Sequence, residues 1–276
     1  MEWRKLSDKK PYNLHFGTTS WLYPGWKGLV YFGEYNSAKE FKKKALIEYF
    51  RIPVFDFVEV DYTYYTYPKF EQLSALDESV PCGKNLVFKI TREVFSQGII
   101  NADLFKDNFL RNFTDSILSK TSFFHIQFSW FAKFDVRLLD NVIQFREKVK
   151  LPLSVEFRNV EALLYLNKLV EAGITPCINH WSFMPKLRDQ LQHLNLSSVV
   201  DIYIRLLTPL NVTYEEAVSR FSPYDQLKEF QVDCREDLVN FIRTNKSINT
   251  WIAVNNRFEG CAPLTVIGIL NSLNGR

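Results

Sequence analysis

The chain has 276 residues, of which 46% are hydrophobic and 24% are charged, the ordinary composition of a soluble globular protein. Its formal net charge of +3 is too small to indicate a nucleic-acid or membrane partner by itself. No run of about 18 apolar residues is present, so the sequence predicts no membrane-spanning segment and no membrane partner.

The N-terminus and the cysteines indicate the compartment. The first ten residues contain no apolar segment of the kind that forms a secretory signal. The four cysteines are far apart and have neither zinc-type nor redox spacing. Reduced thiols are the default for such a chain, so we expect a cytoplasmic protein with no metal and no other cofactor.

Eight short apolar runs, rich in Val, Ile, Phe and Tyr, have the character of buried strands. They predict strands near residues 13–18, 54–61, 86–91, 122–128, 152–157, 174–179, 201–207 and 250–255. Amphipathic stretches with helical spacing lie between most of these runs. Examples are residues 38–50, 102–119, 136–149 and 162–172.

Strands that alternate with helices predict parallel βα units. Eight such units suit one closed barrel, which takes about 250 residues. We therefore predict an α/β fold, a single (β/α)8 TIM-type barrel domain with parallel strands over residues 1–276. A doubly wound open sheet is the alternative, but no Gly-X-Gly-X-X-Gly motif follows the first strand. Within the long connection 208–249, we expect a loop over the barrel mouth and then a helix over 224–246.

Polar residues gather at the C-terminal ends of the predicted strands. They are Glu59, Asp61, Lys89, Gln127, Glu156, Arg158, Arg205, Asn255 and Asn256. Side chains two residues apart in a strand share a face, so Glu59 lies beside Asp61 and Glu156 beside Arg158. In a (β/α)8 barrel these strand ends meet at one mouth, where the fold places its chemistry. The pattern therefore predicts one shared polar site.

Two interpretations of this site stay open. In the first, Glu59 and Glu156 pair with the basic residues in a buried ion network that closes the barrel, because buried charges need partners. In the second, Lys89, Arg158 and Arg205 hold an anionic group of a substrate. Glu59 or Glu156 is then the catalytic general acid or base. The two interpretations differ in whether arginines clamp both carboxylates or leave open space between them.

The rest of the predicted substrate pocket is aromatic and polar. Trp21, Tyr23 and Tyr65 are expected to form its walls and to stack on a ring of the substrate. Its further polar members are Asp61, Gln127, Asn255 and Asn256.

The histidines give little sign of a metal site, because no pair of them has metal-ligand spacing. His125 lies within a predicted strand, where a hydrogen-bonded core histidine is the usual case. His180 ends the sixth predicted strand, where it could bind a metal or act as a base.

Six short motifs occur in order along the chain. They are Gly17-Thr-Thr-Ser-Trp-Leu-Tyr-Pro-Gly-Trp26, Val58-Glu-Val-Asp-Tyr-Thr-Tyr-Tyr-Thr-Tyr-Pro68, Phe88-Lys89, Glu156-Phe-Arg158, Tyr203-Ile-Arg-Leu206, and Asn255-Asn256 followed by Gly260-Cys-Ala-Pro263. Their order resembles the YecE-like family, a domain of unknown function (number 72) with a TIM-barrel fold. The resemblance extends from residue 16 to about residue 270 and implies the barrel. It implies no reaction, because the function of that family is not characterised.

Two departures from the family pattern remove histidines that could carry protons. Asn159 follows Arg158 where the family has His, and Leu207 follows Leu206 where the family again has His. If those histidines act in the family, this chain binds its ligand without catalysis.

Two hypotheses follow. In the first, the protein is a hydrolase that acts on a phosphate- or sugar-containing substrate at the barrel mouth. In the second, it is a non-catalytic barrel that binds an anionic metabolite or a nucleic acid through the same residues, although the modest charge does not favour nucleic acid. The expected partner is a small anionic or sugar-containing ligand, with nucleic acid as the less favoured alternative, and the sequence predicts no oligomeric state.

Overall fold

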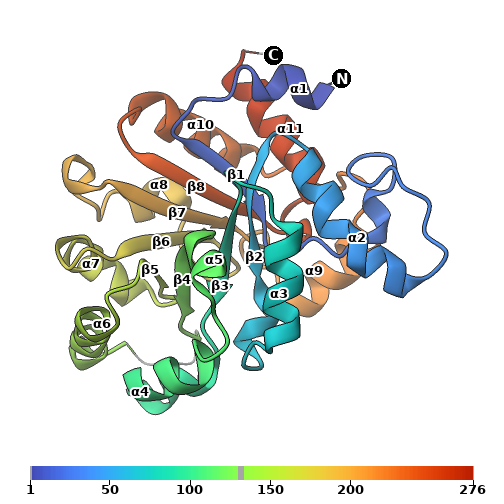
Figure 1. Cartoon of the computed structure of the whole chain (residues 1–276). Helices are drawn as coiled ribbons and strands as arrows, with labels where there is room; N and C mark the ends of the chain where they lie inside the picture. Colours follow the sequence, from blue (N-terminus) through green and yellow to red (C-terminus); the bar gives the residue numbers. More distant parts are fainter. Residues whose placement is uncertain (1, 130–133, 276) are drawn as a thin grey trace.

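The computed structural model describes residues 2–129 and 134–275, which form a closed barrel of parallel strands in the order β1 to β8 (Figure 1). The strands are β1 Leu14–Thr18, β2 Phe55–Val60, β3 Asn85–Lys89, β4 Thr121–Gln127, β5 Leu153–Glu156, β6 Thr175–His180, β7 Asp201–Leu206 and β8 Asn249–Val254. Each predicted strand is present, with ends within two residues of the expected ones. The predicted (β/α)8 fold is therefore confirmed.

Helices surround the ring of strands, and the first and last helices lie side by side (Figure 1). They are α1 Glu2–Ser7, α2 Ala38–Arg51, α3 Phe70–Ser79, α4 Ala102–Leu104, α5 Asp115–Ser119, α6 Val136–Val149, α7 Leu166–Glu171, α8 Leu187–Leu191, α9 Tyr214–Phe221, α10 Val232–Thr244 and α11 Ala262–Leu273. Within the described part of the chain, no helix is long and apolar enough to cross a bilayer.

The predicted helix over residues 102–119 is interrupted in the structure. After α4, the chain forms a wide turn, η4 (Phe105–Phe109), with hydrogen bonds between residues five apart, before α5 begins at Asp115. Thr114 starts α5 by accepting a hydrogen bond from the backbone of Ile117. The wide turn places the rings of Phe105 and Phe109 against Phe124 of β4. Packing of these aromatic rings thus overrides the continuous helical pattern.

The prediction of a plain loop before residue 224 was wrong, because α9 lies in that segment. Thr213 and Glu216 form a reciprocal capping box that starts α9, a signal visible in the sequence. The predicted helix over 224–246 is also shorter than expected, since α10 begins only at Val232. Tyr224 has a φ of +72°, in the left-handed region, so a right-handed helix cannot include it.

The barrel interior has an apolar half and a polar half. Toward the N-terminal ends of the strands it is filled by Phe57, Val87, Phe123, Cys177, Tyr203, Trp251 and Ala253. Two residues further along the same strands come the polar side chains Glu59, Lys89, His125, Asn179, Arg205 and Asn255. Because side chains alternate along a strand, the second set also points inward, one layer nearer the mouth. The fold thereby assembles the polar site from most of its strands.

Candidate functional site

Arg205, near the end of β7, lies at the centre of the polar layer and is only 2% exposed. Its Nε and Nη2 donate to the two carboxylate oxygens of Glu59, at 2.7 and 2.9 Å. Its Nη1 donates to Gln127 Oε1 at 2.9 Å and also to Glu156 Oε2. One guanidinium therefore joins four strands, β2, β4, β5 and β7, and clamps both predicted catalytic carboxylates.

Glu156 is fully buried and accepts hydrogen bonds from several sides. Arg158 Nε donates to its Oε1 at 2.7 Å, while Arg205 Nη1 and His125 Nε2, the latter at 3.3 Å, reach its Oε2. Burial would raise the pKa of Glu156, but the charges of Arg205 and Arg158 hold that pKa well below its ordinary value. Glu156 is therefore ionised at neutral pH. Burial lowers the pKa of His125, so its ring is neutral at neutral pH. Its Nε2–H donates a hydrogen bond to the ionised Glu156 carboxylate.

Glu59 is equally enclosed. In addition to the bidentate contact with Arg205, its Oε1 accepts a hydrogen bond from the Tyr203 hydroxyl. Burial, reinforced by the nearby Glu59 charge, raises the pKa of Tyr203 well above its ordinary value, so the hydroxyl keeps its proton. Neither Glu59 nor Glu156 has exposed surface. The Arg205 guanidinium bridges the two carboxylates by donating to both.

A further ion pair joins Lys89 at the end of β3 to Asp61, the first residue of the 3-10 turn η2 (Asp61–Tyr64), at 2.7 Å. The Lys89 ammonium lies 4.5 Å from the ring centroid of Tyr64. Burial lowers the pKa of Lys89, although Asp61 opposes this. Burial would raise the pKa of Asp61, but the Lys89 charge holds it below its ordinary value. The Asp61 side chain is 42% exposed, so this pair reaches the surface.

These contacts define a polar cluster with balanced charge, called the inner cluster below. Its cations are Lys89, Arg158 and Arg205, its carboxylates are Glu59, Asp61 and Glu156, and Gln127 is its amide. Each cation has a carboxylate within the cluster, so the formal charges cancel. This arrangement is the one expected of the buried ion network, and it leaves none of these cations without a counterion.

The three predicted aromatic wall residues differ in position. Trp21 is buried in the core, where its carbonyl oxygen accepts a hydrogen bond from the hydroxyl of Tyr31. Tyr23 is half-buried and packs its ring edge-on against Tyr224. Tyr65 is 64% exposed at the mouth. Only Tyr23 and Tyr65 therefore present a ring near the surface of the site.

Asn255 and Asn256, also predicted to bind substrate, use their side chains to shape the loop after β8. Asn255 Nδ2 donates to Thr19 Oγ1 at 2.7 Å, and its Oδ1 accepts from the backbone N–H of Arg257 at 2.9 Å. Asn256 Oδ1 accepts from Trp26 Nε1 at 3.2 Å and from the backbone N–H of Ala262 at 2.8 Å. Both side chains are buried, and neither donates to or accepts from the inner cluster.

The structure adds residues that the sequence interpretation did not include. Trp181, just after β6, lies against Arg158, with 4.6 Å between the guanidinium carbon and the ring centroid. Arg257 belongs to the 3-10 turn η7 (Asn256–Phe258), and its guanidinium carbon lies 4.6 Å from the ring centroid of Tyr214. Arg257 lies just after the end of β8, so the selection of polar residues at the C-terminal ends of predicted strands could have included it.

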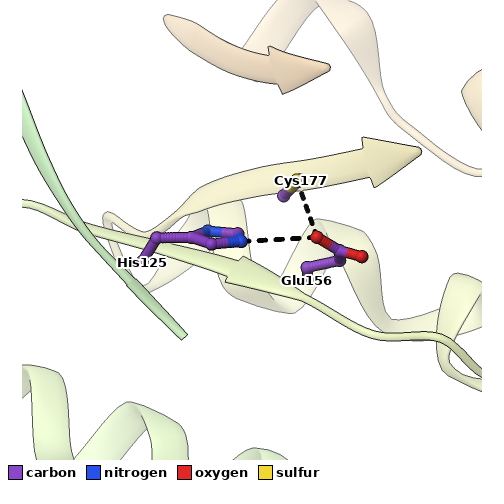
Figure 2. Close-up of side chains that lie close together, drawn as sticks. All are labelled: His125, Glu156 and Cys177. Atoms are coloured by element: carbon purple, nitrogen blue, oxygen red, sulfur yellow. Dashed lines mark hydrogen bonds and ion pairs between the residues drawn. The ribbon is translucent and has the colours of Figure 1, made fainter. Parts of the chain in front are cut away.

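Figure 2 shows a second group that spacing along the sequence could not reveal. His125, Glu156 and Cys177 come from three adjacent strands, and their potential ligand atoms lie within 4.8 Å of one another. These donor types suit an ion such as zinc. However, Arg205 already donates to the same Glu156 oxygen, and burial raises the pKa of the Cys177 thiol well above its ordinary value. A cation would need a thiolate and would repel the guanidinium, so the trio fits a metal poorly.

His180 faces away from the inner cluster. Its Nδ1 donates to the carbonyl oxygen of Thr208 at 2.8 Å, and burial lowers its pKa. It lines a separate cavity of about 390 Å³ under the β7–β8 connection, together with Lys186, Cys234 and Asp237. His180 is therefore not a base of the barrel-mouth site.

Comparison with known proteins identifies the family. Residues 15–276 match the family described as "Protein of unknown function DUF72". The chain belongs to this family. A DUF72 family protein from Thermotoga maritima is 18% identical, with a TM-score of 0.66, over 95% of this chain and 99% of that chain. A DUF72 family protein from Enterococcus faecalis is 16% identical, with a TM-score of 0.69, over 95% of each chain.

At these identities the likeness to solved DUF72 structures shows the shared barrel alone. A search of curated proteins finds no match. The YecE-like family is the same family as DUF72, so the family match over residues 15–276 confirms the resemblance seen in the six motifs.

Proposed function

We propose that this DUF72 protein binds a small phosphate- or sugar-containing anion at the C-terminal mouth of its barrel. The observation that carries the proposal is a recurrent pairing at the mouth, where basic side chains lie against aromatic rings. Lys89 contacts Tyr64, Arg158 contacts Trp181, and Arg257 contacts Tyr214. The planar fork of an arginine guanidinium suits a phosphate or a carboxylate. The exposed ring of Tyr214 suits the apolar face of a ligand ring.

Within this proposal, Glu59 and Glu156 position other groups and do not transfer protons. A general acid must carry a proton and reach the substrate. Glu156 is ionised, both carboxylates are fully buried, and Arg205 clamps both. The replacement of the two family histidines by Asn159 and Leu207 also favours binding without catalysis. The non-catalytic barrel is therefore our first candidate.

Hydrolysis of a phosphate- or sugar-containing substrate is the second candidate, favoured by the Asp61–Lys89 pair. Asp61 is ionised and partly exposed, so it could accept a proton from an attacking water. Lys89 has a lowered pKa, so it could return a proton to a leaving group. A hydrolase would thus use this pair in place of the two glutamates. Under this candidate, Asp61→Asn abolishes the formation of product.

The experiment is calorimetric titration of the full chain with inorganic phosphate, ribose 5-phosphate and unphosphorylated ribose. We expect the phosphates to bind and Trp181→Ala to weaken binding by roughly three- to tenfold, since one aromatic contact contributes about 0.5–1.5 kcal/mol. Leu164→Ala, which removes an exposed apolar side chain from the 3-10 turn after β5, is the control. If neither inorganic phosphate nor ribose 5-phosphate binds, the proposal is overturned. Release of phosphate or free sugar during the titration would favour the hydrolase.

We also propose a cytoplasmic location and a small-molecule partner. The four cysteines are all free, and three of them are buried, which suits a reducing compartment. The charges of the inner cluster cancel, and the whole chain carries only +3. This modest charge supports a small anion over a nucleic acid.

A further inference from the structure

The cation Arg257 differs from the cations of the inner cluster in its partners. Lys89, Arg158 and Arg205 each form an ion pair with a carboxylate. Among residues 2–129 and 134–275, Arg257 forms no such pair, and its Nε is buried without a hydrogen-bond partner. A buried donor on a charged side chain is costly to leave unpaired. The buried Nε is out of reach of a ligand, but the guanidinium carries a charge that no carboxylate of the described residues neutralises, and an anionic ligand would neutralise it.

The fold holds Arg257 in place from both sides. Its backbone N–H donates to Asn255 Oδ1. The Oδ1 of Asn256 accepts from Trp26 Nε1 and from the backbone N–H of Ala262, which fixes the turn that carries Arg257. Its guanidinium lies over the ring of Tyr214, the first residue of α9. α9 in turn contacts η7. The hydrogen bonds of the two buried asparagines go to Thr19, Trp26 and the turn around Arg257, so these side chains serve to present Arg257 at the mouth.

The surroundings of Arg257 combine exposed rings with one carboxylate. Tyr214 is 57% exposed, and Tyr65 is also exposed. Asn256, the residue before Arg257, accepts from the indole of Trp26, whose ring lies 5.0 Å from the ring of Tyr23. The ring of Tyr65 lies 5.1 Å from that of Tyr64, which packs on Lys89, the partner of Asp61. The charge of Arg257 also acts to lower the pKa values of Tyr23, Asp61 and Tyr65. Asp61 uses Oδ1 for Lys89 and is partly exposed, so its other oxygen can accept from a ligand hydroxyl.

We propose that Arg257, Tyr214, Tyr65 and Asp61 form a subsite for a sugar phosphate. The phosphate binds the Arg257 guanidinium, a face of the sugar ring packs on Tyr65 or Tyr214, and a sugar hydroxyl donates to Asp61. This inference rests on the proposed function and names its ligand class. The sugar phosphate can be free or part of a nucleotide, because both present the same groups to this subsite.

The test is calorimetric titration of the full chain with ribose 5-phosphate, using inorganic phosphate, ribose and adenosine 5′-monophosphate as comparison ligands. We expect Arg257→Ala to weaken ribose 5-phosphate at least about tenfold, the effect of losing one charged hydrogen bond. Arg257→Lys keeps the charge but loses the planar fork, so we expect an intermediate loss. Tyr214→Ala should weaken binding and Tyr214→Phe should not. Arg220→Ala, which removes a cation paired with Glu229 at the other end of α9, should have no effect.

Each outcome decides the proposal. Wild-type binding that is unchanged in both Arg257→Ala and Tyr214→Ala but lost in Trp181→Ala would overturn the subsite and leave the proposed function standing. Absence of wild-type binding would overturn both. Ribose that binds as tightly as ribose 5-phosphate would overturn the role of the phosphate. If Arg257→Ala does not fold, as judged by circular dichroism, the Arg257→Lys and Tyr214→Ala variants decide. Tighter binding of the nucleotide than of ribose 5-phosphate supports the subsite and identifies a nucleotide as the source.

Discussion

The inner cluster and the outer rim of the barrel mouth both contain arginine, but the arginines have different partners and different roles. The inner cluster, centred on Arg205, is buried, and its carboxylates and cations neutralise one another. The outer rim consists of Trp181, Tyr65, Tyr214 and Arg257, and two of its rings are largely exposed. A buried network whose charges cancel holds strands together, whereas an unpaired cation beside exposed rings is available to a ligand. Charge at a strand end is therefore not enough to identify a binding residue, because its partners decide.

The comparison predicts its largest effect for Arg205→Met. Removing the guanidinium leaves Glu59 and Glu156 buried without their shared counterion, so we expect a loss of roughly 3–5 kcal/mol in the free energy of unfolding. Denaturant unfolding measures this loss. Arg137→Met, which removes an exposed ion pair with Asp135, is the control and should stay close to wild type. A variant as stable as wild type would show that the inner cluster does not hold the barrel.

The inner cluster also predicts the pH dependence of stability. The folded-state pKa values of Glu156 and His125 are both lowered, so the unfolded chain binds more protons than the folded chain as the pH falls. The free energy of unfolding should be highest above about pH 6.5 and should decline below it as His15, His125 and His180 gain protons in the unfolded chain. It should decline more steeply below about pH 4.3 through Glu156. Denaturant unfolding across this range tests the sign. In Glu156→Gln the free energy of unfolding should fall less steeply below about pH 4.3 than in wild type. An unchanged pH dependence in this range would contradict the role of Glu156 in acid destabilisation.

A smaller effect is expected at Asn256, which supports the turn that carries Arg257 of the outer rim. Asn256→Ala leaves the Trp26 indole N–H and the Ala262 backbone N–H unpaired, so we expect a loss of about 1–3 kcal/mol in the free energy of unfolding. It should also weaken ribose 5-phosphate, because the turn that presents Arg257 loosens. Asn240→Ala, an exposed change on α10, is the control and should stay within about 0.5 kcal/mol. Weaker binding without lower stability would show that Asn256 touches the ligand.

No effect is expected from metal removal. Arg205 already provides a cation to Glu156 within the His125–Glu156–Cys177 trio, so chelation by EDTA should leave the melting temperature unchanged. Elemental analysis of the purified protein should find no stoichiometric zinc. Stoichiometric zinc that is lost in Cys177→Ser would contradict this interpretation.

The sequence was sufficient for the barrel and for the polar residues at its strand ends, because strand ends follow from local apolar runs. The Glu59, Glu156 and Arg205 positions were likewise visible as charges at those ends. Their partners were not, because pairing depends on register between strands. His125 illustrates this, since only the pairing of β4 with β5 brings its ring to Glu156.

The outer rim was largely missed for a related reason. Trp181 and Tyr214 lie in loops and at a helix start, where no periodic pattern indicates which way a ring points. Asn255 and Asn256 drew attention as strand-end amides, yet their hydrogen bonds go to the loop and to Trp26. Arg257 beside them carries the unpaired charge, which becomes evident only when all ion pairs of the mouth are known.

The most direct test of this division is a matched titration of ribose 5-phosphate into Glu59→Gln and Arg257→Ala. Glu59→Gln removes a carboxylate of the inner cluster at constant size, and Arg257→Ala removes the unpaired cation of the outer rim. The account predicts that Glu59→Gln binds the ligand as wild type does, with a lower melting temperature, and that Arg257→Ala loses at least about tenfold in affinity. Binding lost in Glu59→Gln and retained in Arg257→Ala would contradict it.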